Sequence, residues 1–254
     1  MLRTNKVERP EPGVAHAPGA AGPRGDVDAP LLRLGATAGV VGVVLQVAME
    51  RLHPHHVDPN QSAAVFREYA HSEHWTAVHL GQFLGTFLIV VALVALARAL
   101  SRQPGVAGAL AVAGGVAAVI VGAVFAVQMA VDGVALKAAI DSWAGAATPG
   151  DRSSAFHVAE SVRWTEKGLA GFFQTINGMT LFSLGLSMAL GRSFPRWVGW
   201  VGVTAGAAFV AGGISTAHTG FSAASGTLLM PATLLLVVFL GGVFTTMWRR
   251  GSTR

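Results

Sequence analysis

Long apolar blocks separated by short polar segments dominate the 254-residue chain. At 1.5 Å per helical residue, six of these blocks are long enough to cross a hydrocarbon layer of roughly 30 Å. They cover residues 31–50, 75–100, 106–131, 168–190, 197–216 and 226–248. The pattern predicts an all-α polytopic membrane protein, a six-transmembrane-helix bundle that occupies residues 31–248.

Two of the polar connections, residues 51–74 and 132–167, keep a helical spacing of apolar positions and predict a partly helical cap on one side of the bundle. In the first, Asn60 is a candidate N-cap, and Phe66 and Tyr69 share a helix face. The second should form two helices. The bundle therefore carries an outer layer that is neither loop nor membrane span.

The second connection has its own stop and start signals. Lys137 and Asp141 are spaced for an ion pair one helical turn apart. The stretch "ATPGD" interrupts the helix, and Ser153 or Ser154 is the candidate cap of the helix that follows.

Charge distribution predicts the orientation. With the ends of the chain on the same side, twelve Lys and Arg residues fall on that side and six on the other. This asymmetry predicts cytoplasmic termini and an extracytoplasmic cap. Fifteen Arg against three Lys suggests a bacterial genome rich in GC, so the expected location is a bacterial cytoplasmic membrane. Residues 1–30, with five of the eleven prolines, predict a disordered cytoplasmic tail, and residues 249–254 a second short tail.

The amino-acid composition excludes several classes of site and partner. Hydrophobic residues make up 52% and charged residues 12% of the chain, against roughly 25% charged residues in a soluble domain. No cysteine is present, which excludes thiol catalysis and thiolate metal sites. The net charge of +5 does not indicate nucleic acid, because the basic residues sit at the ends of apolar blocks. The expected partner is the lipid bilayer, and the sequence leaves the oligomeric state open.

Polar residues inside the spans concentrate near the outer ends of four helices, at i+3 or i+4 spacing. Such residues are costly in a membrane and normally face a bundle interior or a wet cavity. We therefore predict one pocket, open to the outside, with Glu50, Asp132 and Glu166 as candidate catalytic carboxylates. The lining residues would be Gln46, Gln82, Gln128, Gln174 and Asn177.

Histidines cluster on the same side, with six of the nine between residues 53 and 79. An imidazole with carboxylates suits a divalent metal such as zinc, iron, copper or manganese. The candidate ligands are His79, His71, His74, His157 and Glu160. The alternative for the "HPHH" group at residues 53–56 is a solvated loop.

These observations favour a membrane-embedded enzyme, metal-dependent, acting on an amphiphilic or lipid-like substrate. Three alternatives stay open: a metal-free cyclase or isomerase using carboxylate acid–base chemistry, a metal or proton transporter, and a non-catalytic sensor or assembly factor. The transporter is disfavoured because the inner halves of the spans are apolar. Haem ligation by His79 and His218 is disfavoured because His218 lies at the very edge of its span.

The stretches "HLGQFLG", "AVDGVALKAAIDSW", "AESVRW" and "PRWVGWVG" resemble those of small polytopic membrane proteins common in actinobacteria and described as uncharacterised. The resemblance covers about residues 31–248. It implies a membrane topology and carries no assignment of activity or site.

Overall fold

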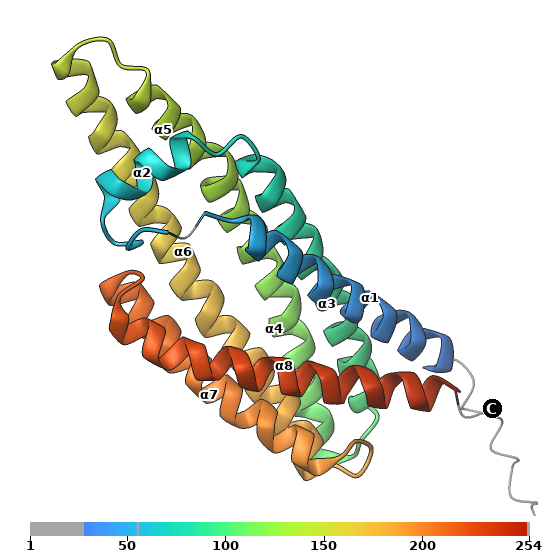
Figure 1. The fold of residues 1–254 in the computed structure, drawn as a ribbon. Helices are drawn as coiled ribbons and strands as arrows, with labels where there is room; N and C mark the ends of the chain where they lie inside the picture. The colour runs from blue at the N-terminus through green and yellow to red at the C-terminus, as the bar shows by residue number, and fades with distance from the viewer. Residues whose placement is uncertain (1–27, 55, 253–254) are drawn as a thin grey trace, which may run out of the picture.

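A computed structural model describes residues 28–54 and 56–252 (Figure 1). All regular secondary structure in these residues is helical. The elements are α1 (Asp28–Leu52), α2 (Ser62–Ala70), α3 (Trp75–Leu100), α4 (Gly105–Ala130), the π-helix η1 (Val131–Leu136), α5 (Lys137–Ala144), α6 (Pro149–Leu190), α7 (Arg196–Thr219) and α8 (Ala223–Ser252). Most of the tail predicted at 1–30 lies outside the described residues, and α1 already includes residues 28–30.

The six long helices form a closed ring in chain order. Contacts run from α1 to α3, and then through α4, α6 and α7 to α8, which packs back against α1. Successive helices run in opposite directions, so α1 begins and α8 ends at the same end of the bundle (Figure 1). The prediction of an all-α helical bundle of membrane type is confirmed.

Five helical segments are long and apolar enough to cross a membrane: α1, α3, the continuous helix α4–η1–α5, α7 and α8. The predicted span at 168–190 forms the second half of α6 and packs against α4 and α7, but it is not among the five. Gln174 and Asn177 lower its hydropathy, and both are only half-buried. The expected count of six thus exceeds by one the helices that qualify by length and composition.

Glycines bring α6 and α7 into backbone contact. A Cβ atom added to Gly178 would stand 2.6 Å from the carbonyl oxygen of Gly206, and one added to Gly185 would stand 2.7 Å from that of Gly199. Small residues at such positions let membrane helices approach closely. This close packing fixes the position of α6, which carries several polar residues, beside α7.

The helices α4–η1–α5 and α6 extend well beyond a bilayer and carry the cap. They contain 40 and 42 residues, and each is about 60 Å long, roughly twice the hydrocarbon thickness. Their projecting ends pack with α2 around a second apolar cluster that includes Phe66, Trp75 and Trp143 (Figure 1). The predicted partly helical cap is confirmed, as is the ion pair between Lys137 and Asp141.

The first residues of α6 differ from the prediction. Thr148 is the N-cap, and its Oγ1 accepts a hydrogen bond of 3.1 Å from the backbone N–H of Asp151. Pro149 occupies the first turn, where its missing N–H costs nothing. The helix therefore starts one turn before Ser153 and Ser154, which were expected to cap it.

The N-terminus of α2 also differs from the prediction. Gln61, and not Asn60, is the N-cap residue, and its side chain makes no capping hydrogen bond. The backbone N–H of Asn60 instead donates to Oδ1 of Asp58 at 2.9 Å. The expected apolar face is present, because Phe66 and Tyr69 are buried. Tertiary packing of that face, rather than a cap, holds this short helix.

Candidate functional site

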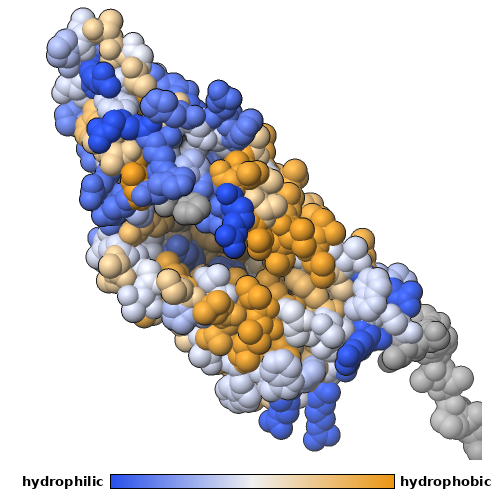
Figure 2. Space-filling model, viewed as in Figure 1, coloured by the Kyte–Doolittle hydropathy of each residue, from blue (hydrophilic) through white to orange (hydrophobic). Residues whose placement is uncertain are grey.

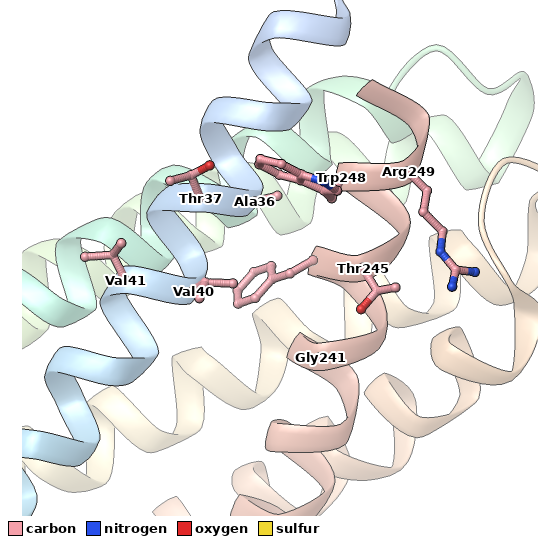
Figure 3. A pocket seen from close by; sticks show the side chains of 9 residues that line it. Ala36, Thr37, Val40, Val41, Gly241, Thr245, Trp248 and Arg249 are labelled. Carbon is pink, nitrogen blue, oxygen red and sulfur yellow. The ribbon is translucent and has the colours of Figure 1, made fainter. Parts of the chain in front are cut away.

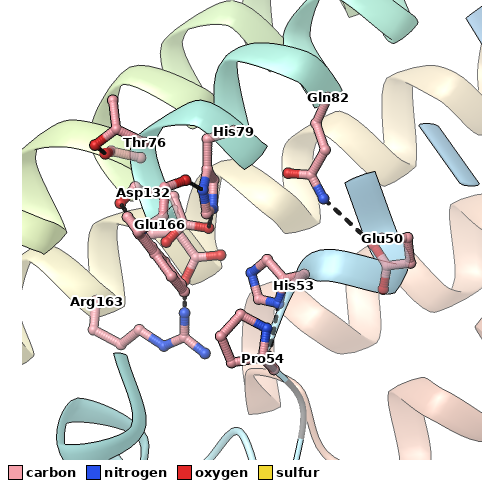
Figure 4. A network of polar contacts seen from close by, with 11 residues as sticks. Glu50, His53, Pro54, Thr76, His79, Gln82, Asp132, Arg163 and Glu166 are labelled. Atoms are coloured by element: carbon pink, nitrogen blue, oxygen red, sulfur yellow. Dashed lines mark hydrogen bonds and ion pairs between the residues drawn. The ribbon is translucent and has the colours of Figure 1, made fainter. Parts of the chain in front are cut away.

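His79 and Asp132 form the centre of a buried polar cluster where the bundle meets the cap (Figure 4). His79 lies in the second turn of α3 and Asp132 in η1, and His79 Nε2 is 3.1 Å from Asp132 Oδ2. His79 Nδ1 lies 2.7 Å from the carbonyl oxygen of Trp75. Because a carbonyl only accepts, Nδ1 carries a proton and donates it. If Nε2 also carries a proton, it donates that proton to the carboxylate. If it does not, its lone pair and the carboxylate can bind the same cation.

His53, directly after α1, completes the group. Its Nδ1 donates a hydrogen bond of 2.8 Å to the carbonyl oxygen of Pro54. One ligand atom each from His53, His79 and Asp132 lies within 4.8 Å of the other two. Bonds of about 2.0–2.2 Å to a zinc ion would draw these atoms closer together. The three groups could therefore hold a metal ion after small side-chain rotations.

The second oxygen of Asp132 supports this interpretation. Asp132 Oδ1 is buried and has no hydrogen-bond partner among the described residues. Buried polar atoms normally have a partner, so an ionised oxygen in this position calls for a cation or a proton. Two imidazole nitrogens and a carboxylate suit zinc, iron, manganese or copper.

The π-helix η1 aims Asp132 at α3. The carbonyl oxygen of Asp132 accepts a 2.9 Å hydrogen bond from Trp75 Nε1, and that of Gly133 accepts a 2.8 Å bond from Thr76 Oγ1. Both donors sit in the first turn of α3, one turn before His79. Short π-helical segments within α-helices frequently mark functional sites. Here the two hydrogen bonds connect η1, which carries Asp132, to the helix that carries His79.

Gly133 provides a direct test of this arrangement. A Cβ atom added to Gly133 would stand 2.5 Å from the Cβ of His79, which is closer than real side chains approach. We expect Gly133→Ala to displace His79 or η1, and so to lower both the thermal unfolding midpoint and the metal content of the purified protein. Fluorescence-monitored unfolding and elemental mass spectrometry measure the two effects.

The matched control is Gly168→Ala in α6, because nothing lies within 4 Å of the added methyl group. Alanine favours a helix over glycine by about 1 kcal/mol, so this variant should be at least as stable as the wild type. Equal behaviour of the two variants would show that the contact between Gly133 and His79 does not constrain the site.

Aromatic rings enclose the two histidines. The ring centroid of Trp75 lies 4.4 Å from that of His79 and 5.0 Å from that of His53, and Tyr69 stacks on Trp75 at 4.0 Å. Burial lowers the pKa of His53, the charge of His79 lowers it further, and Asp132 opposes the change. The neutral imidazole, which is the metal-binding form, is therefore favoured at His53 near neutral pH.

The cap portion of α6 adds a buried ion pair. Arg163 Nη1 donates to Glu166 Oε2 at 2.8 Å, and the two side chains are 4% and 3% exposed. Arg163 Nη2 also donates to the carbonyl oxygen of Pro59 at 3.4 Å. Burial raises the pKa of Glu166 and the charge of Asp132 raises it further, while Arg163 and Lys167 oppose the shift. The ionisation of Glu166 therefore depends on Arg163.

Glu50 lies at the open edge of the cluster. Its side chain is exposed, and its Oε2 accepts a hydrogen bond of 3.4 Å from Gln82 Nε2 (Figure 4). Figure 2 shows a hollow in this face of the molecule, between the apolar surfaces of α1 and α8, with hydrophilic residues at its depth. A carboxylate at the edge of a buried charged cluster can exchange protons with a molecule that enters it.

Five of the residues predicted from sequence thus meet in one place, and they come from α1, α3, η1 and α6: Glu50, His79, Gln82, Asp132 and Glu166. The other four amides predicted to line the pocket lie about one to three helical turns deeper. Gln46 donates to Thr86 Oγ1, Asn177 is half-buried, and the Oε1 atoms of Gln128 and Gln174 are buried without a hydrogen-bond partner among the described residues.

Four predicted metal ligands lie elsewhere. His71, His74 and His157 are exposed, and the Nδ1 of His71 donates to a backbone carbonyl at the end of α2. Glu160 accepts a 3.3 Å hydrogen bond from Ser62. None of the four belongs to the group of ligand atoms around His79. His157 and Glu160 lie one turn apart on α6, whereas His71 and His74 lie in the turn between α2 and α3, so the i+3 spacing of that pair does not correspond to a helix.

The sequence analysis considered His53 only within the "HPHH" group and missed Arg163. Arg163 precedes Glu166 by three residues, so it shares a helix face with a residue that was singled out.

No family model, curated protein or solved structure matches the chain. Its class is therefore defined by the fold and the site alone. It is an all-α protein with helices suited to span a membrane, and it holds a buried histidine–carboxylate cluster beneath a helical cap.

Proposed function

We propose that the chain is a metal-dependent membrane enzyme whose metal centre is formed by His53, His79 and Asp132. One observation carries the proposal: a ligand atom from each of the three lies within 4.8 Å of the others, although the residues come from three separate elements. The hydrogen bonds from both Nδ1 atoms to backbone carbonyls support it, because such bonds orient imidazole ligands in metal sites.

Three protein ligands that leave a coordination position open are the pattern of a catalytic zinc site. A metal ion in such a position lowers the pKa of bound water to about 7 and polarises a substrate oxygen. The same donor set also accepts iron, manganese or copper. The chemistry that fits best is hydrolysis.

A metal held by His53, His79 and Asp132 would supply an activated water and a Lewis acid for the hydrolysis of a carboxylic or phosphoric ester. Glu50 would take the proton from that water and return it to the alcohol that leaves when the ester bond breaks. Glu50 suits this role because it is exposed at the edge of the cluster and is held by Gln82. The pair formed by Arg163 and Glu166 would position the cap over the substrate.

The substrate we propose is amphiphilic or lipid-like. The site lies at the ends of apolar helices, next to the hollow between α1 and α8 (Figure 2). A polar group could reach the cluster from there while its apolar part stays among apolar side chains. The distribution of basic residues supports our proposal that the cap lies outside a bacterial cytoplasmic membrane and that both termini are cytoplasmic.

Turnover of native lipids tests the proposal. Purified protein loaded with zinc, manganese or iron is incubated with a total bacterial lipid extract, and the products are followed by lipid mass spectrometry. We expect one lipid class to decrease with the metal present, and Asp132→Asn to abolish the change. His74→Ala is the control, because this exposed residue is outside the group.

Metal binding without turnover of any lipid would favour a carrier or a sensor. Turnover that persists after complete removal of metal would favour acid–base catalysis by the pair His79 and Asp132, whose 3.1 Å contact also suits a shared proton.

A further inference from the structure

A second candidate site lies at the other end of the bundle, where α1 begins and α8 ends. An apolar pocket of about 530 Å³ opens there between the two helices (Figure 3). Val40 and Val41 line it from α1, and Gly241, Phe244 and Trp248 line it from α8. The residues of the metal-binding cluster are not among those that line it, so this pocket is a separate feature.

The pocket exists because the two helices touch on one side of it and diverge on the other. A Cβ atom on Gly39 would stand 2.3 Å from the ring of Phe244, and one on Gly35 would stand 2.7 Å from Met247 Cε. At Gly241, by contrast, nothing lies within 4 Å of the added atom. An apolar groove left empty in a bilayer would lose dispersion contacts along its whole lining. An acyl chain is the group that the membrane supplies to fill it.

One arginine lines the pocket, and a second lies near it. Arg249 lines the pocket from α8, and Arg33 lies one turn before Thr37, on the face of α1 that lines it. Both are exposed, and Arg33 Cγ is 2.6 Å from the position of a Cβ on Gly251, so the two helix ends lie together. Guanidinium groups bind phosphate in a bidentate manner, and basic pockets between membrane helices bind anionic headgroups.

Trp248 supports a position of this end of the pocket at the level of the lipid headgroups. It lines the pocket and is 51% exposed, as expected of an indole at the boundary between hydrocarbon and headgroups. Trp248 and Arg249 thus line the end of the pocket that we infer to lie at the headgroup level, and Val40, Val41 and Gly241 line the part that lies deeper in the membrane.

We propose that this pocket binds an anionic phospholipid from the leaflet at this end of the bundle. One acyl chain lies between α1 and α8 against Val40, Val41 and Gly241, and the phosphate is held by Arg33 and Arg249. The site is independent of the metal centre and of the proposed enzymatic function.

Photoreactive lipids test the site. The full-length protein is reconstituted into nanodiscs with a trace of phosphatidylglycerol or phosphatidylcholine that carries a diazirine on one acyl chain. After illumination, peptide mass spectrometry locates the label. We expect phosphatidylglycerol to label peptides from α1 and α8 around Val40 and Gly241, and phosphatidylcholine to label them much less.

Two variants, each with a control, test separately the binding of the acyl chain and the binding of the headgroup. Gly241→Leu fills the pocket and should abolish labelling there, whereas Gly226→Leu, also in open space on α8 but outside the pocket, should not. The double variant Arg33→Gln/Arg249→Gln should weaken phosphatidylglycerol binding about 30-fold, because each basic residue near a membrane contributes about 1 kcal/mol and 1.4 kcal/mol corresponds to tenfold. Arg192→Gln is its control.

Two results would overturn the proposal. Equal labelling by both lipids, unchanged in the double variant, would show that no headgroup is recognised. Loss of a dimer in Gly241→Leu, with cross-links between copies at α1 and α8, would show that a second copy of the chain occupies the pocket.

Discussion

Replacing His79 with alanine should remove bound metal from the protein. The variant deletes one of the three proposed ligands, and it leaves Asp132 Oδ2 without its 3.1 Å partner. Loss of groups that merely support a metal ligand costs about 10–100-fold in affinity, so loss of the ligand itself should exceed that. Elemental mass spectrometry on detergent-purified, metal-loaded protein is expected to give about one ion per chain for the wild type and background for His79→Ala.

The controls for this prediction are His71→Ala and His74→Ala, which remove exposed histidines outside the group. Both should keep the metal content of the wild type. Circular dichroism checks that His79→Ala keeps its helices. An equal loss of metal in all three variants would point to adventitious binding by surface histidines, and a wild type without metal after loading would remove the metal centre from the proposal.

The second large effect is expected on stability. Arg163→Met leaves Glu166 buried beside Asp132 without its hydrogen-bonded counter-charge, and removes the hydrogen bond to Pro59. Removing one partner of a buried ion pair costs about 3–5 kcal/mol. For a chain of this size the thermal unfolding midpoint should fall by about 6–20 °C. Thermal unfolding in detergent, followed by tryptophan fluorescence, measures the change.

The double variant Arg163→Met/Glu166→Leu tests the cause, because replacing both members of a buried pair with apolar residues is often neutral. It should recover most of the loss. The pH dependence has a definite sign. In Arg163→Met the pKa of Glu166 is raised further in the folded state, so its protonation is favoured by folding, and stability should fall as pH rises from 6 to 8. A double variant no more stable than Arg163→Met would show that the arginine acts through its packing and not its charge.

The observed helices show how much local sequence patterns determine. The predicted block at 75–100 coincides with α3, and the expected break between two cap helices falls at residues 145–148. Hydropathy and helical spacing are properties of consecutive residues, so they can be read from the sequence without knowledge of the fold. The exposed or buried face of α2 followed from the same spacing, although its capping residue did not.

The site was only partly predictable. The sequence indicated that carboxylates and a histidine on four helices share one depth, because depth follows from position along each span. It did not distinguish His53 from the other loop histidines, since the path of the chain after α1 folds His53 back against Trp75 and His79. The helical register of η1 was also hidden, because a π-helix has no sequence pattern of its own.

The sequence by itself thus determined the membrane class, the position of the long helices and the level at which polar residues gather. Only the tertiary structure decided which of these residues touch. The contact of His79 with Asp132, the approach of His53 and the distance of His71, His74 and His157 all depend on how the helices are rotated about their axes and packed. Those rotations arise from contacts between distant residues, such as Gly133 against His79 and Gly178 against Gly206, which no stretch of consecutive residues contains.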